Sequence, residues 1–111
     1  MPEILRVTAE TFDSMVLASS RPVLVDFYAD WCGPCRALQP ALEDVAREFD
    51  GEVTVVKLNV DDEPPLAARY GVQGIPALLL FDAGQVADRL TGVASRTAMA
   101  GVIEKCLGSR K

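Results

Sequence analysis

The chain contains no histidine, and this absence excludes several kinds of catalytic and metal site. A Cys-His or Ser-His pair needs an imidazole as proton acceptor, and many metal sites need one as a ligand. Cysteine is also scarce, with 3 residues in a chain of 111. Three thiols without an imidazole fall short of the four ligands of a structural zinc site. The sequence therefore predicts no metal site.

Basic residues and long apolar runs are scarce as well. The chain has 11 Lys and Arg against 16 Asp and Glu, which argues against a broad basic face for nucleic acid. Glycine-rich phosphate loops are missing, and the one acidic run, residues 61–63, is expected to be a solvated loop. No apolar run has the length that spans a bilayer, and residues 1–6 do not resemble a secretory signal. We therefore expect a cytoplasmic protein that binds neither membrane nor nucleic acid.

Half of the residues are hydrophobic, which is enough for one domain with a core over residues 1–111. The expected strands are residues 4–7, 23–28, 53–60, 77–81 and 86–91. The expected helices are residues 11–18, 34–49, 66–70 and a last one after Ser95, and Pro40 should kink the second. This order predicts an α/β fold, with a mixed sheet between helices on both faces. Its first crossovers should be parallel and its last hairpin antiparallel.

Residues 31–35, Trp-Cys-Gly-Pro-Cys, lie where the second expected strand gives way to a helix. Cysteines three apart face each other across one helical turn, and a bridge enclosing two residues removes little unfolded-state entropy. This spacing favours a redox couple over a structural staple, and over two inert buried thiols. Cys32, at the helix start, is expected to be an exposed nucleophile with a lowered pKa, and Cys35 a shielded resolving thiol. Gly33 should permit a tight turn, and Pro34 suits the first helical turn.

Two charged residues interrupt apolar strands. Asp26 lies in a strand expected to be buried on both faces, so its pKa should be raised. An acid of that kind near a dithiol can take a proton from the resolving thiol, although a structural buried pair is the alternative. Lys57, in another central strand, could lie beside Asp26 and tune it, or could extend its amine to solvent.

Two further residues have two interpretations each. Pro76 opens the apolar strand over residues 77–81, as a proline at a strand entry can. The Ile75–Pro76 bond is either part of a plain strand start or a cis bond that exposes the Ile75 backbone to a substrate. Cys106 lies on the apolar face of the last helix, where an inert buried thiol is expected and a regulatory or dimer-forming thiol is the alternative.

Together these motifs resemble the thioredoxin family, from about residue 11 to residue 107. The segments that carry the resemblance are Val25-Asp26-Phe27, Trp31-Cys32-Gly33-Pro34-Cys35, Lys57-Leu58-Asn59-Val60-Asp61, Tyr70-Gly71-Val72, Gly74-Ile75-Pro76 and Phe81-Asp82-Ala83-Gly84. The resemblance implies a thioredoxin fold, a central mixed five-stranded sheet with four flanking helices. The chain departs from the family pattern at Tyr28, where tryptophan is common, and at Ala77, where threonine is usual.

The resemblance also implies an activity, the reduction of protein disulfides by a monomer that a thioredoxin reductase recharges. NADPH would act only through that reductase, and no cofactor would be bound. By resemblance Cys32 attacks, Cys35 resolves, Asp26 accepts a proton and Pro76 is cis. The implied substrate-binding residues are Trp31, Gly33, Pro34, Gly74, Ile75, Gly92 and Val93.

Two functions of different class remain open at this point. Relatives that oxidise disulfides usually carry a histidine between the cysteines, and its absence here favours an electron donor. The alternative is an accessory subunit with the same fold and a redox-independent role.

Overall fold

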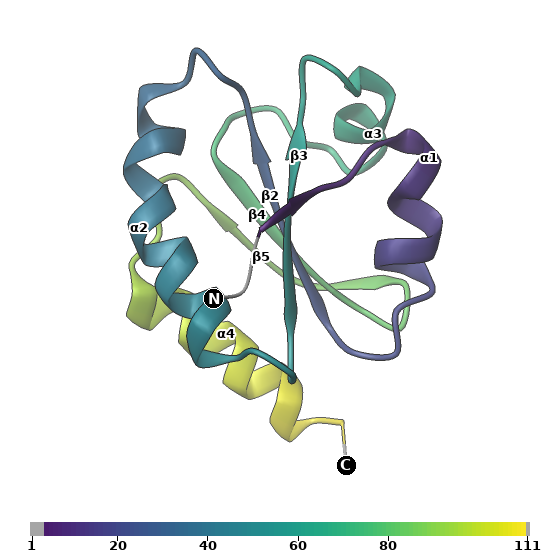
Figure 1. The fold of residues 1–111 in the computed structure, drawn as a ribbon, viewed down its shortest axis with the longest axis vertical. Coiled ribbons are helices and arrows are strands. Elements are labelled where there is room, and N and C mark those ends of the chain that lie inside the picture. Colours follow the sequence, from purple (N-terminus) through teal and green to yellow (C-terminus); the bar gives the residue numbers. More distant parts are fainter. Residues whose placement is uncertain (1–3, 111) are drawn as a thin grey trace.

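Five strands form one mixed sheet at the centre of the fold (Figure 1). The computed structural model describes residues 4–110. The strands are β1 (Leu5–Arg6), β2 (Val23–Tyr28), β3 (Thr54–Asn59), β4 (Ala77–Asp82) and β5 (Gln85–Thr91), in the order β1-β3-β2-β4-β5. Strands β1, β3 and β2 are parallel, whereas β4 is antiparallel to both its neighbours. The central position of β2 explains why all six of its residues are buried.

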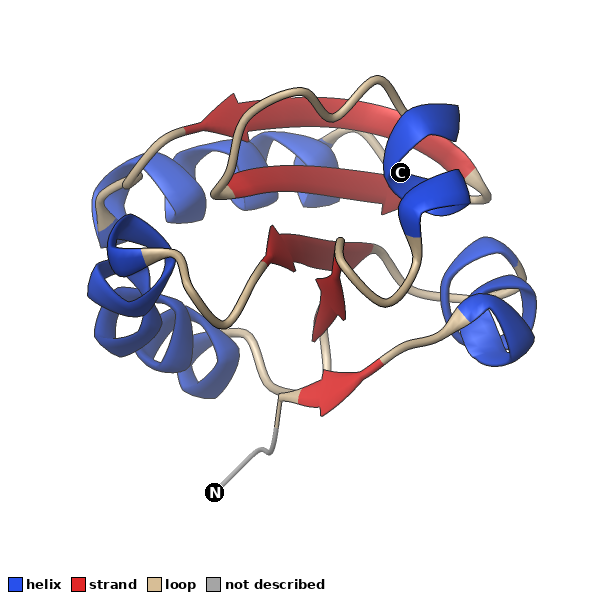
Figure 2. Cartoon of the chain, turned by 90° about the horizontal axis from the view of Figure 1, so that it is seen from above, coloured by secondary structure: helices blue, strands red, loops and turns tan. Residues whose placement is uncertain are grey.

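Helices cover both faces of this sheet, as Figures 1 and 2 show. They are α1 (Ala9–Phe12), which continues into the π-helical turn η1 (Asp13–Leu17), α2 (Gly33–Glu48), α3 (Pro64–Arg69) and α4 (Arg96–Gly108). One core lies between the sheet and the pair α2 and α4, and a second lies on the α1 and α3 side. The expected fold, a five-stranded mixed sheet with four helices, is confirmed within residues 4–110.

Several helix boundaries differ from the sequence-based expectation, and the third helix is Pro64–Arg69 rather than residues 66–70. The first helix begins at Ala9 rather than at residue 11, because the Thr8 backbone N–H donates to Thr11 Oγ1 at 2.9 Å in a capping box. The last helix begins after Ser95 as expected, with the Ser95 side chain accepting from the backbone of Ala98, but it includes Gly108. Pro40 lies inside α2, which continues through it to Glu48.

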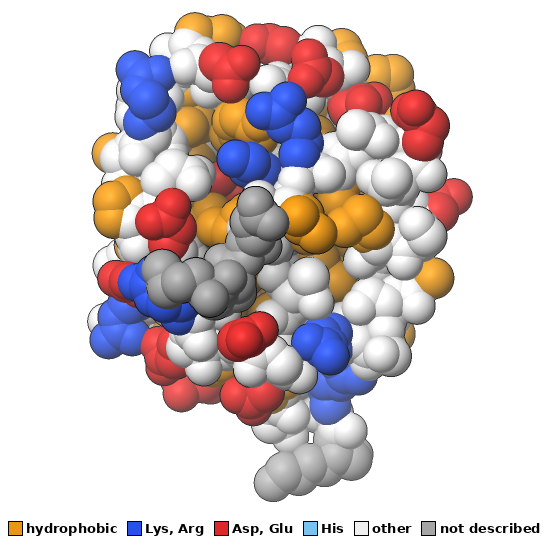
Figure 3. Space-filling model, in the orientation of Figure 1, with side chains coloured by type: hydrophobic (Ala, Val, Ile, Leu, Met, Phe, Trp, Pro, Cys, Tyr) orange, Lys and Arg blue, Asp and Glu red, His pale blue; other side chains and the backbone are white. Residues whose placement is uncertain are grey.

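The surface carries charges of both signs. On the face drawn in Figure 3, acidic and basic side chains are interspersed with apolar ones. In the part of the chain that the structure describes, no helix combines the length and the apolar character needed to cross a bilayer.

The hairpin between β4 and β5 turns in two residues, Ala83 and Gly84. Asp82 pairs with Gln85, and the two residues between them have φ of 53° and 81°. Positive φ at both positions is typical of a type I′ turn, which suits the twist of a hairpin. Gly84 also lies close to η1, since a Cβ there would lie 3.1 Å from the Leu17 carbonyl oxygen. The turn thus requires glycine at its second position and strains alanine at its first.

Replacing Ala83 by asparagine should stabilise the protein. Asparagine tolerates the left-handed region far better than alanine and is favoured at this position of a type I′ turn. We expect the Ala83→Asn variant to gain about 1 kcal/mol in the free energy of unfolding, measured by urea denaturation. Ala87→Asn is the control, because Ala87 is exposed in the same hairpin and does not have a positive φ. An equal gain in both variants would contradict this account of the turn.

Candidate redox site

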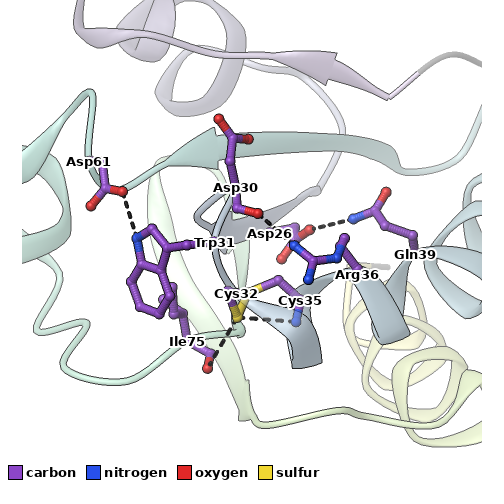
Figure 4. The surroundings of a disulfide bond; sticks show 9 residues. All are labelled: Asp26, Asp30, Trp31, Cys32, Cys35, Arg36, Gln39, Asp61 and Ile75. Carbon is purple, nitrogen blue, oxygen red and sulfur yellow. Dashed lines mark hydrogen bonds between the residues drawn. A yellow bond between two sulfur atoms is a disulfide. The ribbon is translucent and has the colours of Figure 1, made fainter.

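The two cysteines of the Trp-Cys-Gly-Pro-Cys segment form a disulfide at the start of α2 (Figure 4). Cys32 is the N-cap residue, with extended backbone angles, and Cys35 lies one turn into the helix. Their Cα atoms are 5.3 Å apart, and the Cys35 backbone N–H donates to Cys32 Sγ at 3.1 Å. The same N–H and the helix dipole are placed to stabilise a Cys32 thiolate once the disulfide is reduced.

The expected exposure of Cys32 is wrong for this disulfide state. Cys32 is 3% exposed and Cys35 is 2% exposed, so both residues are buried. Ile75 packs against the pair, and its carbonyl oxygen lies 3.9 Å from Cys32 Sγ. The exposed part of the site is its surroundings, since Trp31 is 69% exposed.

The reason expected for Gly33 is also wrong. Gly33 is not among the glycines with positive φ, and it is the first residue of α2. A Cβ added there would come no closer than 3.9 Å, to a terminal nitrogen of Arg36, which is an ordinary contact. The turn before the helix therefore does not require a glycine at this position.

Four chain segments meet at one edge of the sheet around the disulfide. The segment after β2 carries the cysteines, and the segment after the parallel strand β3 carries Asp61. Because β4 is antiparallel to β2, its first residues also reach this edge, where the Ile75–Pro76 peptide bond is cis. The cis bond named by resemblance is thus confirmed. Strand β5 ends beside it, where the Gly92 backbone N–H donates to the Pro76 carbonyl oxygen at 2.9 Å.

The other residues named for substrate binding lie around this edge. Gly33, Pro34, Gly74, Gly92 and Val93 are exposed, and Ile75 is partly buried. A cavity of about 390 Å³ adjoins the same loop and is lined by residues 71–77, Arg89, Thr91 and Gly92. The tertiary structure therefore brings Ile75 against the disulfide and joins Gly92 to Pro76 beside it.

Asp61, which the sequence analysis assigned to a solvated loop, takes part in this arrangement. The Trp31 indole N–H donates to Asp61 Oδ2 at 2.8 Å (Figure 4). The Asp61 backbone N–H in turn donates to the side chain of the buried Asn59 at 2.9 Å. These bonds hold the exposed indole beside the disulfide. The only sequence signal for this role was the position of Asp61 just after an expected strand.

Asp26 lies fully buried on β2, on the sheet face that α2 covers. Lys57 of β3 is its neighbour in the parallel register, as the sequence suggested. The Gln39 side chain donates to Asp26 Oδ2 at 3.2 Å, whereas Oδ1 has no hydrogen-bond partner among the described residues. Sequence reasoning missed Gln39, because a glutamine on a helix gives no signal of a buried partner.

Burial raises the pKa of Asp26 from its ordinary value of 3.8 to about 7. The hydrogen bond from Gln39 and, to a smaller extent, the charge of Lys57 oppose this rise. Lys57 itself is partly buried, with its Nζ 5.6 Å from the centre of the Tyr28 ring. The hydroxyl of Tyr28, at the position where the family commonly has tryptophan, is buried without a partner among the described residues. The raised pKa of Asp26 agrees with the expectation from its buried strand.

A second cavity lies beside Cys35, Gln39 and Lys57. It has a volume of about 200 Å³ and is lined by Tyr28, Ala29, Asp30, Cys35, Arg36, Gln39 and Lys57. Water can enter a polar cavity of this size, so water can approach this part of the site. Within residues 4–110, no cluster of His, Cys, Asp and Glu is placed to hold a metal ion.

Cys106 lies at the opposite edge of the sheet. Its Sγ is 3.6 Å from Oδ2 of Asp82, the last residue of β4. The first residue of the same strand, Ala77, follows Pro76. A strand of six residues spans roughly 17 Å, so the thiol is remote from the disulfide. Burial, and secondly the charge of Asp82, raise the pKa of Cys106. These properties fit the inert thiol that its apolar helix face suggested.

Comparison with known proteins gives a consistent result. The family model described as Thioredoxin matches residues 3–105. "Thioredoxin 1" of Nostoc sp. is 42% identical over 107 residues, covering 96% of this chain and all of that relative. "Thioredoxin 1" of Synechococcus elongatus is 45% identical, covering 91% of this chain and 94% of the relative. "Thioredoxin 1" of Chlorobaculum tepidum is 46% identical over 90% of this chain and 99% of the relative.

The raised pKa of Asp26 predicts that Asp26→Ala stabilises the protein at neutral pH. Below pH 3.8 both folded and unfolded chains are protonated, and the carboxyl carries no ionisation penalty. Between 3.8 and about 7 the unfolded chain ionises first, so the folded wild type loses stability as the pH rises, and the loss levels off above about 7. We expect Asp26→Ala to gain about 2 kcal/mol at pH 7, after the cost of a small cavity, and to lose stability by that cavity cost, about 2 kcal/mol, at pH 3, where no ionisation penalty is relieved.

Urea denaturation of both proteins at the two pH values tests this prediction. Asp82→Ala is a control, since Asp82 is a partly exposed carboxyl at the far end of β4. A variant that is less stable than wild type at pH 7 would show that Asp26 is held mainly as the ion-pair partner of Lys57.

The environment of Cys106 predicts that Cys106→Ala retains disulfide-reducing activity. The thiol is remote from the disulfide, and its removal leaves only a small cavity. We expect a loss of about 1 kcal/mol in the free energy of unfolding and an unchanged turnover rate. A folded variant with strongly reduced turnover would reveal a redox role for Cys106.

Proposed function

Because this chain belongs to the thioredoxin family, we propose a specific role for each residue around its disulfide. The chain is a thiol–disulfide oxidoreductase that cycles Cys32 and Cys35 between dithiol and disulfide. The observation that carries this conclusion is the Cys32–Cys35 disulfide at the start of α2 in a thioredoxin fold. The direction of the cycle is reduction of the substrate, since no histidine is present to stabilise the thiolate further.

The reaction consists of two thiol–disulfide exchanges. The Cys32 thiolate attacks one sulfur of a substrate disulfide, and the other substrate sulfur leaves as a thiolate. The Cys35 thiolate then attacks Cys32 Sγ in the mixed disulfide and releases the second substrate thiol. Two substrate sulfurs are reduced, and the two cysteines are oxidised to the disulfide seen here. The 3.1 Å hydrogen bond from the Cys35 backbone N–H favours Cys32 as the first nucleophile.

Asp26 accepts the proton that Cys35 must lose in the second exchange. Its raised pKa suits this exchange, since a carboxyl with a pKa near 7 can both take and return a proton at neutral pH. Lys57, beside it on β3, lowers the pKa of the carboxyl through its charge and so tunes it. The 200 Å³ cavity that Cys35 and Lys57 line lets water approach this part of the site.

Substrates dock on the exposed residues around the disulfide. Trp31, held by Asp61, provides an apolar wall on one side. Gly74, Ile75 and Pro76 provide further surface beside Cys32. The remaining contacts come from Gly33, Pro34, Gly92 and Val93. An extended substrate segment can pair with the Ile75 backbone beside Cys32.

The electron donor of the cycle is a thioredoxin reductase that draws on NADPH, and the chain itself binds no cofactor. We place the protein in the cytoplasm, as a monomer with a single domain over residues 1–111, acting on disulfide-containing proteins. NADPH consumption in the presence of a thioredoxin reductase, with insulin as acceptor, tests the whole cycle. In the same assay a Cys32→Ser, Cys35→Ser double variant should be inactive, whereas an accessory subunit would keep its role without either thiol.

The two single variants should differ in a way that identifies the nucleophile. Cys32→Ser removes the attacking sulfur and should abolish insulin reduction. Cys35→Ser leaves the attack intact but prevents release, so it should accumulate mixed disulfides, detectable as a mass increase that dithiothreitol reverses. Normal turnover by Cys35→Ser, or mixed disulfides on Cys35 in the Cys32→Ser variant alone, would contradict these assignments.

A further inference from the structure

We propose that Gln39 is a positioning residue that holds the Asp26 carboxylate in place and favours its ionised form. This inference rests on the proposed function of Asp26 as the acceptor of the Cys35 proton. Gln39 belongs neither to the docking surface nor to the cysteine pair. It acts on the thiol only through Asp26.

The geometry places Gln39 between the helix and the buried acid. Gln39 follows Cys35 by four residues on α2, so both side chains lie on the same face of the helix. Figure 4 shows the Gln39 side chain directed toward Asp26, whose Oδ2 accepts from Gln39 Nε2 at 3.2 Å. The second carboxylate oxygen, Oδ1, is buried and has no partner among the described residues. The amide thus occupies one oxygen and leaves the other for the proton from the thiol.

An amide donor distinguishes the two protonation states of a carboxyl group. The N–H bonds more strongly to the anion than to the neutral acid, which lowers the pKa of the carboxyl. At Asp26 this contribution is larger than that of Lys57, and both oppose the dominant effect of burial. Without Gln39, burial would be opposed mainly by the partly buried amine of Lys57. Gln39 therefore extends the use of Asp26 as a base toward lower pH.

Among the described residues, none of the other groups around Asp26 donates a hydrogen bond to its carboxylate. On β3 the neighbour in register is Lys57, and on β4 it is the apolar Leu78. Helix α2 contributes Cys35, Arg36 and Gln39 to the cavity wall, and β2 and the residues after it contribute Tyr28 and Asp30. Among the hydrogen bonds of the described residues, the one from Gln39 is the one that reaches the Asp26 side chain.

Gln39→Met tests the proposal, since methionine keeps the length of the side chain and removes the donor. Gln39 is partly exposed, so the variant should fold. Gln85→Met is the matched control, because Gln85 is an exposed glutamine in the hairpin at the far end of β4. The ionisation of Asp26 is followed by carbon-13 NMR of aspartate carboxyls in the oxidised protein, where the two cysteines do not titrate. The Asp26 signal is assigned by its loss in Asp26→Asn.

In this titration the midpoint of Asp26 should rise by about one pH unit in Gln39→Met and stay unchanged in Gln85→Met. An unchanged midpoint in Gln39→Met would overturn the proposal. An equal rise in both variants would overturn it as well, since the effect would then be independent of the hydrogen bond. This measurement involves no turnover, so it decides the effect of Gln39 whether or not Asp26 serves as the proton acceptor.

The kinetic consequence is measured by single-turnover reduction of insulin across pH. At pH 7 the ionised fraction of Asp26 should fall from about a half to about a tenth, so Gln39→Met should be about fivefold slower. The difference should vanish near pH 9, and Gln39→Met should add nothing in an Asp26→Asn background. A uniform loss at every pH, or a loss that persists without Asp26, would overturn the positioning role. An Asp26→Asn protein as fast as wild type would instead refute the proposed function of Asp26, and with it the kinetic part of this inference.

Discussion

The burial of Asp26 on the central strand is the constraint on which the chemistry of the site depends. Strand β2 lies between β3 and β4, with helices over both faces, so a carboxyl at this position has no access to bulk water. The cost of an anion there raises the pKa of Asp26 to about 7, a value that suits the proton-accepting role proposed for it. The protein therefore keeps a destabilising residue in its core beside Cys35. Gln39 and Lys57 limit that destabilisation without removing it.

The topology of the sheet brings the remaining groups to the same place. The parallel strands β2 and β3 end at one edge, and the antiparallel strand β4 begins there. Helix α2 starts at this edge as well, so the positive end of its dipole lies at Cys32, whose Sγ accepts from the Cys35 backbone N–H. The sheet thus holds the disulfide, the buried acid and the Ile75–Pro76 segment in one arrangement. The sulfur chemistry then requires little movement of the backbone.

The two faces of the sheet differ in the residues that they bury. The core on the α1 and α3 side is wholly apolar among its buried members and contributes packing. The face toward α2 combines a similar apolar core with the buried acid and the disulfide. Cys106 belongs to that apolar core, at the edge remote from the disulfide, and this position separates it from the redox pair. The same fold therefore accommodates one disulfide-forming pair of cysteines and one buried free thiol apart from it.

Much of this protein follows from its sequence alone, because the signals are local or periodic. The spacing of Cys32 and Cys35 at a strand-to-helix boundary, the apolar runs of the strands and the charge of Asp26 within one of them predicted the fold and the centre of the site. The contacts made by polar side chains depended on the tertiary structure. Gln39 lies 13 residues from Asp26, and Asp61 lies 30 residues from Trp31. No sequence pattern indicates that either pair forms a hydrogen bond. The burial of Cys32 likewise depends on tertiary packing, since Val60 and Ile75, both distant in the sequence, pack against the cluster that contains the disulfide. Periodicity determines which residues face the core, whereas the partners of a polar side chain are set only when separate strands and helices have packed together.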